Sequence, residues 1–480
     1  MTSAGEPPLA VDLDGTLIGT DTLYEGVLQA VKRNPLLLFR FPGWILRGKA
    51  AFKREIADRV ELDVAFLPYN LPLIDRLRAQ RDHRTLLLCT AADHRFAGAV
   101  AKHLDLFHEV MATRDDVNLG AGNKARALVG RYGEGGFDYA GNDVSDLPVF
   151  AAARRAVVVN PSFGLRRRRG RITNLDQGHP VEAGTGLGPY LRALRPHQWV
   201  KNLLVFVPLL ATFDGRYLGT ILPAVLAFVC FCLVASAGYL LNDLLDLSAD
   251  RRHARKRLRP LAAGAVALPH AVLMMAGLLV GGFLIALQIS LLFAGILLLY
   301  AIGTTLYSLW LKRVPLLDTL VLAGLYTVRI LAGAAAIVVE PSVWLLSFSM
   351  FFFLSLALAK RHSELRDLQG VPGGPGTIPG REYQSDDVST LISQGAASGY
   401  AAVLVLALYI DSESVREHYR HPRLIWLICP LVLYWINKLW LNSQRRQVDD
   451  DPIVWAFQNR VSRAIAFLSV VLLLLARWLP

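Results

Sequence analysis

The spacing of apolar residues changes along the chain. Up to about Pro189 the uncharged apolar runs are no longer than a single β-strand, whereas beyond that point runs of about twenty residues dominate. An α-helix of about twenty apolar residues is long enough to cross the hydrocarbon core of a bilayer. We therefore expect an α/β domain at residues 1–160, a basic and glycine-rich linker at 161–190, and an all-α polytopic membrane bundle at 191–480.

Nine segments of the second part are candidate membrane spans, at residues 199–213, 218–241, 268–288, 291–311, 316–339, 342–359, 391–410, 424–441 and 461–479. Lys and Arg concentrate in every second loop, at 251–259, 312–313, 360–381 and 445–446. The positive-inside rule then places these loops and the N-terminal domain in the cytoplasm and the C-terminus outside. The first apolar stretch stops at Asp12, too early for a cleavable signal peptide. The sequence thus predicts an integral protein of the bacterial cytoplasmic membrane.

Composition narrows the possible partners. The 480 residues are 53% hydrophobic and 19% charged, which excludes a disordered or fibrous chain. Lys and Arg exceed Asp and Glu by 51 to 39, and a basic excess on an apolar chain favours anionic lipid and phosphorylated substrates. No aromatic and basic platform for nucleic acid is present, while a homo-oligomer stays possible. The four cysteines have no CxxC spacing, which excludes a disulfide framework and a structural zinc site.

Two carboxylates follow the first predicted strand. Asp12 and Asp14 stand at i and i+2 after an apolar run, so they point the same way from an extended backbone at the edge where α/β sheets place their chemistry. One carboxylate can attack phosphorus while the other transfers a proton, if a cation neutralises the charge. A second strand-like run ends at Thr90, a third at residues 137–143, and Lys124 lies on a predicted helix between them.

These four segments resemble the haloacid dehalogenase (HAD) phosphatase superfamily over residues 8–160, which implies a Rossmann-like α/β fold. The resemblance implies that Asp12 is the nucleophile and Asp14 the general acid and base, with Thr90 and Lys124 holding the phosphoryl group. Its Mg²⁺ site would include Asp12, Asp14, Asp143 and Asp146. Asn142 occupies the place of the family's usual first acid in the last motif, so a HAD fold without turnover is the alternative.

Residues 20–75 are too long for a simple crossover and are expected to form a helical cap. Between residues 36 and 54 apolar side chains alternate with Lys and Arg, which suits an interfacial helix on anionic lipid or ordinary packing within the cap. Pro35 and Pro42 argue against one straight helix.

The densest polar cluster of the membrane part follows the second span. Asn242, Asp246 and Asp250 stand at i, i+4 and i+8, on one face of a helix. Their oxygen atoms suit a Mg²⁺ ion that bridges a diphosphate, and the basic residues that follow suit the phosphates. The alternative is that these acids and bases only neutralise one another at a helix end. Ionisable residues recur near Lys201, at 307–318 and at 360–364, where a membrane span makes them functional candidates.

The motif NDxxDxxxDRxHxxKRxRP at residues 242–260 resembles the UbiA prenyltransferase superfamily, and the resemblance extends over about residues 190–480. Members are nine-helix bundles with two polar, Mg²⁺-holding motifs above a lipid-accessible pocket. The match is fuller to the decaprenyl-phosphate phosphoribosyltransferase branch, through RPHQWVKN at 195–202, Tyr307-Ser308-Leu309 with Lys312, and Lys360-Arg361 with Glu364. The resemblance implies one or two Mg²⁺ ions held by Asn242, Asp243, Asp246, Asp250 and Asp318. It implies substrate contacts from Lys201, Arg251, His253, Lys256, Arg259, Tyr307, Lys312, Lys360, Arg361 and Glu364.

The second acidic motif of the aromatic-substrate branch, DxxxD, is incomplete, because Leu322 stands four residues after Asp318. A lone acid with nearby basic residues favours transfer of 5-phosphoribose from phosphoribosyl pyrophosphate (PRPP) to a polyprenyl phosphate, with release of diphosphate. The HAD domain could then remove the 5-phosphate of the product. The alternatives are a prenyltransferase acting on a small acceptor, with an inactive HAD domain, and a transporter or lipid-binding scaffold.

Overall fold

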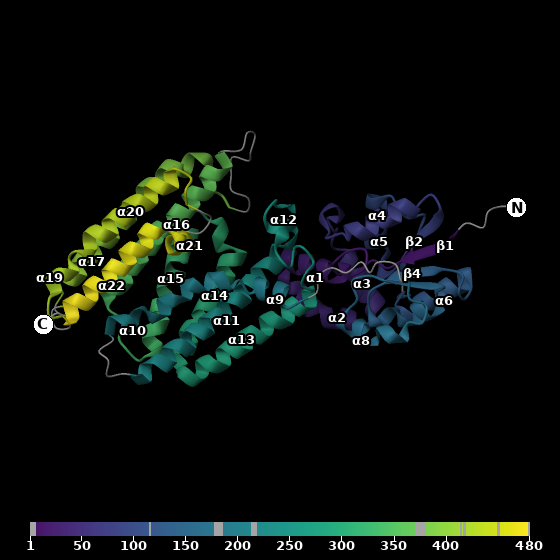
Figure 1. Cartoon of the computed structure of the whole chain (residues 1–480), viewed down its shortest axis with the longest axis horizontal. Coiled ribbons are helices and arrows are strands. Elements are labelled where there is room, and N and C mark those ends of the chain that lie inside the picture. The colour runs from purple at the N-terminus through teal and green to yellow at the C-terminus, as the bar shows by residue number, and fades with distance from the viewer. Residues whose placement is uncertain are drawn as a thin grey trace. The chain divides into compact units, whose positions relative to one another are not determined.

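The computed structural model describes residues 6–114, 117–176, 186–212, 218–369, 381–412, 415, 419–448 and 452–478. The chain divides into two compact units (Figure 1). Unit 1 comprises residues 1–194 and 239–275, and unit 2 comprises 195–238 and 276–480. Helices α11 (Ile221–Leu245) and α13 (Leu268–Ile289) each have residues in both units. The boundary predicted at 161–190 stays a prediction, and unit 1 also contains a segment from between two predicted spans.

Five parallel strands form the sheet of unit 1, in the order β3-β2-β1-β4-β5. They are β1 (Glu6–Val11), β2 (Arg84–Asp93), β3 (Glu109–Thr113), β4 (Asp138–Gly141) and β5 (Arg155–Val158). Successive residues of a strand face opposite sides of the sheet, so Val11 and Leu88 enter one apolar core while Ala10 and Leu87 enter the other. Both faces are buried, as in other parallel sheets. The predicted α/β fold is confirmed, and β1, β2 and β4 end at the same edge.

In the part of the chain that the structure describes, unit 1 also contains ten α-helices besides the parts of α11 and α13. They are α1 (Thr22–Arg33), α2 (Phe41–Leu46), α3 (Lys49–Ala57), α4 (Leu71–Gln80), α5 (His94–Leu104), α6 (Ala121–Tyr132), α7 (Leu147–Ala152), α8 (Phe163–Arg168), α9 (Gly188–Ala193) and α12 (Leu247–Arg252). The insertion after β1 is helical, as expected of a cap. The two prolines break it, because Pro35 begins the 3₁₀ helix η1 (Pro35–Arg40) and Pro42 lies in the first turn of α2. Leu37 and Trp44 are buried in the cap core.

Unit 2 is all-helical. Its helices are α10 (Val207–Thr212), α14 (Leu291–Leu309), α15 (Leu317–Ala336), α16 (Val343–Gln369), α17 (Val388–Ile410), α19 (Pro422–Ile425), α20 (Ile428–Gln444), α21 (Pro452–Gln458) and α22 (Arg460–Trp478). Within the described residues, eight stretches including α11 and α13 are long and apolar enough to cross a membrane. In α22 most of the apolar surface is exposed, with 11% of its most apolar window buried, as expected of a helix that faces lipid.

The first predicted span does not form a single long helix. In its described part, residues 196–212 form the 3₁₀ helix η5 (Pro196–Phe206) followed by α10, so the count of about nine spans is reduced to eight long helices. Two contacts hold the η5 segment against α15. Asn202 is buried, and its side chain binds Arg329 of α15. A Cβ atom at Gly333 of α15 would overlap the carbonyl oxygen of Val205 in η5. The backbones of the two helices can therefore approach this closely only because residue 333 is a glycine.

Candidate functional sites

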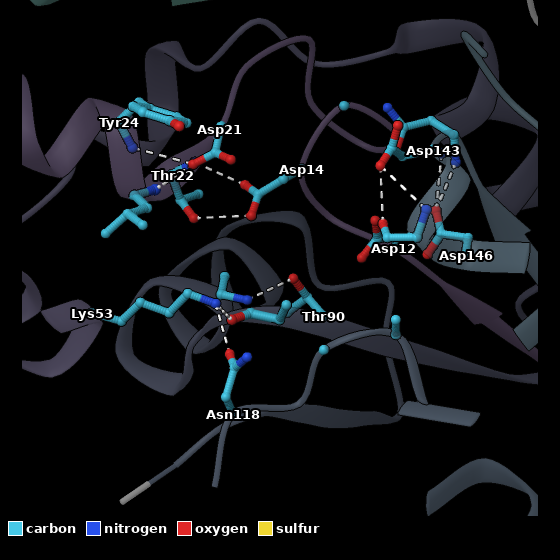
Figure 2. A pocket seen from close by; sticks show the side chains of 18 of the residues that line it. Asp12, Asp14, Asp21, Thr22, Tyr24, Lys53, Thr90, Asn118, Asp143 and Asp146 are labelled. Carbon is cyan, nitrogen blue, oxygen red and sulfur yellow. Dashed lines mark hydrogen bonds between the residues drawn. The ribbon is translucent and has the colours of Figure 1, made fainter. Parts of the chain in front are cut away.

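A cavity of about 740 Å³ lies where β1, β2 and β4 end (Figure 2). All six residues predicted for phosphoryl transfer line it, namely Asp12, Asp14, Thr90, Lys124, Asp143 and Asp146. They converge because the carboxyl ends of neighbouring parallel strands share one edge of the sheet. The side chain of Thr90 is fully buried, and its hydroxyl accepts a hydrogen bond from the backbone N–H of Ala92.

Lys124 joins the two carboxylates on one side of the cavity. Its Nζ atom lies 2.8 Å from Asp12 and 3.4 Å from Asp146, and it also donates to the hydroxyl of Tyr139. Burial raises the pKa of Asp12 to about 6, against the attraction of Lys124. Burial alone would lower the pKa of Lys124, but the two carboxylates raise it above its usual range. The lysine is therefore a cation beside the predicted nucleophile.

Asp14 lies apart from that group, toward helix α1 (Figure 2). Its carboxylate accepts hydrogen bonds from the backbone N–H of Thr22 at 2.8 Å and from the Thr22 hydroxyl at 3.3 Å. Burial, and then the negative charge of Asp21, raise the pKa of Asp14 well above its usual value. A raised pKa favours the protonated carboxyl group, which is the form that a general acid requires.

The last acidic motif is occupied by protein contacts. Asp146 accepts the backbone N–H groups of Asn142 and Asp143, each at 3.1 Å, and the hydroxyl of Tyr139 at 2.8 Å. Burial tends to raise the pKa of Asp143, but hydrogen bonds from Ser162 and Ser145 lower it overall. Both carboxylates therefore already accept hydrogen bonds from the protein at oxygen atoms that a Mg²⁺ ion would use.

Asn142 itself lies against the turn that follows the two predicted catalytic carboxylates. A Cβ atom at Gly15, whose φ is +75°, would overlap the Asn142 side-chain amide. The oxygen atoms of Asp12, Asp14 and Asn142 line the same cavity and have the chemistry that Mg²⁺ prefers. Among the residues the structure describes, no three His, Cys, Asp or Glu side chains already form a metal centre.

Lys53 and Asn118 line this cavity, and the sequence reasoning did not identify them as site residues. Lys53 of α3 reaches in from the cap and donates to the backbone carbonyl of Ala91 at 2.6 Å and to the side-chain oxygen of Asn118 at 2.9 Å (Figure 2). Burial lowers the pKa of Lys53, although Asp14 and Asp21 partly oppose this. In the sequence Lys53 is one of several basic residues of the cap, and no local signal separates it from the others.

The first polar motif of the membrane part belongs to unit 1. The backbone N–H of Asp246 donates to the carbonyl of Asn242, and that of Asp250 donates to Asp246, so helical turns continue from α11 into α12. The predicted i, i+4, i+8 arrangement on one face is therefore present. Asp243 and Asp250 are buried, and Arg259 lies 3.2 Å from Asp243 and 2.6 Å from Asp250. Arg259 therefore neutralises these two carboxylates in the structure, and the metal role predicted for them stays a prediction.

The basic residues of this motif separate into two groups. Arg251 is buried and donates to Glu25 of α1 at 2.6 Å and to the carbonyl of Ala262 at 3.1 Å. His253 and Lys256 are exposed, and the His253 ring accepts the backbone N–H of Lys256. His253 and Lys256 are thus on the surface, Arg259 binds Asp243 and Asp250, and Arg251 faces the N-terminal domain.

The second polar cluster, in unit 2, is centred on Asp318 at the start of α15. Both oxygens of this fully buried carboxylate are engaged, by Arg361 at 2.6 Å, by Arg381 at 3.0 Å and by the hydroxyl of Tyr383 at 2.5 Å. Two cations and one hydroxyl group thus already surround the charge of Asp318. The predicted metal role of Asp318 stays a prediction, and its contacts are those of an anchor for two guanidinium groups.

Other predicted residues surround this cluster. Tyr307 accepts hydrogen bonds from Arg361 and Arg381, and Glu364 forms ion pairs with both arginines. Arg381 and Tyr383 were missed, because they lie more than sixty residues from Asp318. Of the three other predicted lysines, Lys201 is buried in η5, Lys312 lies in the 3₁₀ helix η8 (Leu311–Arg313), and Lys360 is half-buried in α16.

Arg329 is a buried cation within α15. It donates to the side-chain oxygen of Asn202 at 2.9 Å and to the hydroxyl of Tyr300 at 2.8 Å, and its guanidinium lies over the rings of Tyr300 and Tyr326. Charged groups inside membrane spans persist where polar and aromatic partners replace water. These contacts hold η5 against α15.

Comparison with known proteins extends this picture. A model of the UbiA prenyltransferase family matches residues 204–461. The uncharacterized protein y4nM of Sinorhizobium fredii is 36% identical over 464 residues, which cover 95% of this chain and 88% of that protein. Decaprenyl-phosphate phosphoribosyltransferase of Corynebacterium glutamicum is 41% identical over 185 residues, which cover 36% of this chain and 54% of that enzyme. The chain thus matches about half of the length of that enzyme.

Two solved structures resemble the two parts of the chain. A UbiA homologue from Archaeoglobus fulgidus, solved with GPP and Mg²⁺, has a TM-score of 0.46 and 18% identity, covering 60% of this chain and 99% of that one. The HAD-family hydrolase t0658 from Salmonella enterica has a TM-score of 0.24 and 17% identity, covering 36% of this chain and 68% of that one.

Proposed function

Because this chain belongs to the UbiA prenyltransferase family, we propose that it is a membrane transferase that moves the 5-phosphoribosyl group of PRPP to a polyprenyl phosphate. The similarity to decaprenyl-phosphate phosphoribosyltransferase supports this choice of substrates. We also propose that the protein lies in the bacterial inner membrane, with the HAD-like domain in the cytoplasm and the C-terminus outside.

The observation that carries the proposal is the arginine cluster around Asp318. A site that binds one Mg²⁺ ion at each polar motif needs a carboxylate at each motif that is free to bind the ion. At the second motif the carboxylate of Asp318 instead forms ion pairs with Arg361 and Arg381. Guanidinium groups recognise phosphate through paired N–H donors. The second motif is therefore suited to the phosphates of a phosphorylated sugar, with fewer bound cations.

The first motif provides the oxygen donors. Asn242, Asp243, Asp246 and Asp250 are the residues that would hold Mg²⁺, which when bound would neutralise the departing diphosphate. Arg259 keeps Asp243 and Asp250 aligned, and Lys256 and Lys312 add positive charge for the leaving group. An oxygen of the polyprenyl phosphate attacks the anomeric carbon, and the bond from that carbon to diphosphate breaks. This oxygen is already anionic, so positioning and charge stabilisation supply the acceleration and no strong base is required.

We propose that unit 1 then removes the 5-phosphate of the product. Asp12 attacks the phosphorus atom, and Asp14 gives its proton to the departing sugar oxygen. Water then hydrolyses the aspartyl phosphate, with Asp14 taking a proton from it. Lys124 and Thr90 hold the phosphoryl oxygens. Two sites on one chain raise the effective concentration of the intermediate to roughly millimolar.

The test uses the full-length protein in lipid nanodiscs with Mg²⁺, polyprenyl phosphate and PRPP labelled in the ribose. We expect the wild type to make lipid-linked ribose, Asp12→Asn to accumulate lipid-linked 5-phosphoribose, and Asp246→Asn to make neither. Asp75→Asn, at an exposed position of α4, is the matched control.

Each part of the proposal can fail separately. A wild-type protein that forms the lipid-linked 5-phosphate and leaves it intact would remove the phosphatase step. Formation of product from a polyprenyl diphosphate and a small aromatic acceptor, without incorporation of PRPP, would replace phosphoribosyl transfer by prenyl transfer.

A further inference from the structure

The segment that carries the first polar motif packs against the N-terminal domain inside unit 1. Arg251 pairs with Glu25 of α1, and Arg252 pairs with Asp63, its Nε atom lying at 2.9 Å. A Cβ atom at Gly264 would lie 2.5 Å from the carbonyl oxygen of Gly19, so the two backbones touch. The motif is thus held by residues that lie more than 180 positions away in the sequence.

The pair of Glu25 and Arg251 is the buried part of this contact. Their side chains are 8% and 6% exposed, and the Nη2 atom of Arg251 lies 2.6 Å from Glu25 Oε1. The same carboxylate oxygen accepts a hydrogen bond from the hydroxyl of Thr20 at 2.6 Å. A charge buried in this way is tolerated only while its partner remains, so neither residue can leave without exposing or stranding the other.

A second cation of α1 reinforces the contact. Lys32, in the last turn of α1, donates to the carbonyl oxygen of Leu245, the last residue of α11, and lies 3.6 Å from Asp246. Carbonyl groups at a helix C-terminus have no partner within the helix and attract cations. Helix α1 therefore fixes both the end of α11 and the segment that follows it.

Each partner of the buried pair is adjacent to one of the two candidate sites. Glu25 lies in the first turn of α1, where Thr22 binds Asp14 of the phosphoryl-transfer cavity. Arg251 directly follows Asp250, which Arg259 binds in the first polar motif. Asp14 is thus connected to the oxygen donors of the first polar motif through the first turn of α1 and the ion pair of Glu25 with Arg251.

We propose that Glu25 of the N-terminal domain is a positioning residue for the transferase motif. Its carboxylate holds Arg251, and through it fixes the backbone that presents Asp250 and Arg259. Helix α1 then connects the two sites, so a displacement of α1 at the phosphoryl-transfer cavity also displaces the motif. The mechanical part of this proposal is independent of the substrates, whereas its effect on transfer rests on the proposed function.

The first test reports on the motif without any substrate. Residues 252–257 contain four exposed sites for trypsin, at Arg252, Arg255, Lys256 and Arg257. Full-length protein in detergent is digested briefly, and cleavage within residues 252–257 is followed by mass spectrometry. Wild type is compared with Glu25→Gln, Arg251→Gln, the double variant and Glu61→Gln, whose residue is exposed in the same domain.

We expect each single variant to raise cleavage by about tenfold or more, because a buried charge is stranded and the segment opens. The double variant strands no charge, so its cleavage should not exceed that of the worse single variant. Glu61→Gln should stay within about twofold of wild type. Equal cleavage in Glu25→Gln and Glu61→Gln, or single effects that multiply in the double variant, would overturn the proposal. If the single variants do not fold, a folded double variant supports the pair and a double variant that also fails overturns it.

The second test measures transfer at varied Mg²⁺ concentration. We expect Glu25→Gln to raise the Mg²⁺ concentration for half-maximal rate about fivefold or more, while the rate at saturating Mg²⁺ stays within about twofold, and Glu25→Asp to restore part of the difference. An unchanged Mg²⁺ requirement together with unchanged cleavage refutes a positioning role. Absence of transfer in the wild type would instead refute the proposed function, and the cleavage experiment would still decide the role of Glu25.

Discussion

Replacement of Asp318 by asparagine separates two roles for this carboxylate. The family resemblance assigns Asp318 to a metal ion, whereas in the structure it binds Arg361, Arg381 and Tyr383. Asparagine keeps the size of the side chain and one acceptor oxygen, but it has no negative charge. Its amide N–H groups would face the N–H and O–H donors of Arg361, Arg381 and Tyr383. If Asp318 anchors the two arginines, the main effect of Asp318→Asn is a loss of stability.

The size of that loss follows from burial. Asp318 and Arg361 have no exposed side-chain surface, and the distance of 2.6 Å between them is that of a charge-assisted hydrogen bond. Removing one partner of a buried ion pair costs about 3–5 kcal/mol. Glu364 remains as a partner of Arg361, so we expect a value near the lower end, about 3 kcal/mol.

The assay compares the melting temperature in detergent with the Mg²⁺ requirement of transfer, measured below the melting range. Asp386→Asn is the matched control, because Asp386 is exposed close to the same cluster. We expect Asp318→Asn to melt on the order of 10 °C below wild type and to need the same Mg²⁺ concentration within about twofold. By contrast, Asp250→Asn should raise that concentration about tenfold or more.

One result would refute this reasoning. An Asp318→Asn protein that melts like wild type but needs about ten times more Mg²⁺ is explained by a metal ligand and not by an arginine anchor. The resemblance would then have identified the role of Asp318 correctly, and the contacts with Arg361 and Arg381 would have to rearrange when Mg²⁺ binds.

Three further predictions concern other parts of the chain. Asp138→Asn removes the carboxylate that binds the buried Arg84 at 2.9 Å, and we expect it to lower the free energy of unfolding of unit 1 by about 3 kcal/mol in chemical denaturation, against less than about 0.5 kcal/mol for Asp75→Asn. Arginines hold the pKa of Asp138 below its usual value despite burial. The stabilisation should therefore be present above about pH 4 and be lost as the pH falls through the lowered pKa. Gly333→Ala should lower the melting temperature, because the new Cβ atom would meet the backbone of Val205, and we expect a loss of about 1–3 kcal/mol in the free energy of unfolding. Gly324→Ala in the same helix is the control, since a Cβ atom there meets nothing within 4 Å and should be neutral or stabilising. Phosphatase activity should fall below about pH 6, where Asp12 takes up a proton, and the midpoint should move to lower pH as Mg²⁺ is raised, because a cation favours the ionised carboxylate; a midpoint that ignores Mg²⁺ would separate Asp12 from the metal.

Properties that depend on neighbouring residues could be predicted from the sequence. The lengths of the apolar runs gave the α/β domain and the membrane helices, which the structure and the family model confirm. The cavity around Asp12 could also be predicted, because parallel strands end at one edge of a sheet and bring Thr90, Lys124 and Asp146 to the same place. The helical spacing from Asn242 to Asp250 is likewise local, and it is present in the structure.

Only the tertiary structure decided which charges meet. Arg251 reads as a phosphate ligand in the sequence, but it pairs with Glu25, which lies 226 residues away. Asp318 is engaged by Arg381 and Tyr383, and the η5 segment packs on α15 through Asn202, which binds Arg329, and at Gly333, where the two backbones approach closely. The spacing of residues along a chain determines which side chains share a helix or strand face. It carries no information on which distant carboxylate will neutralise a buried cation, because that choice depends on how the folded elements pack.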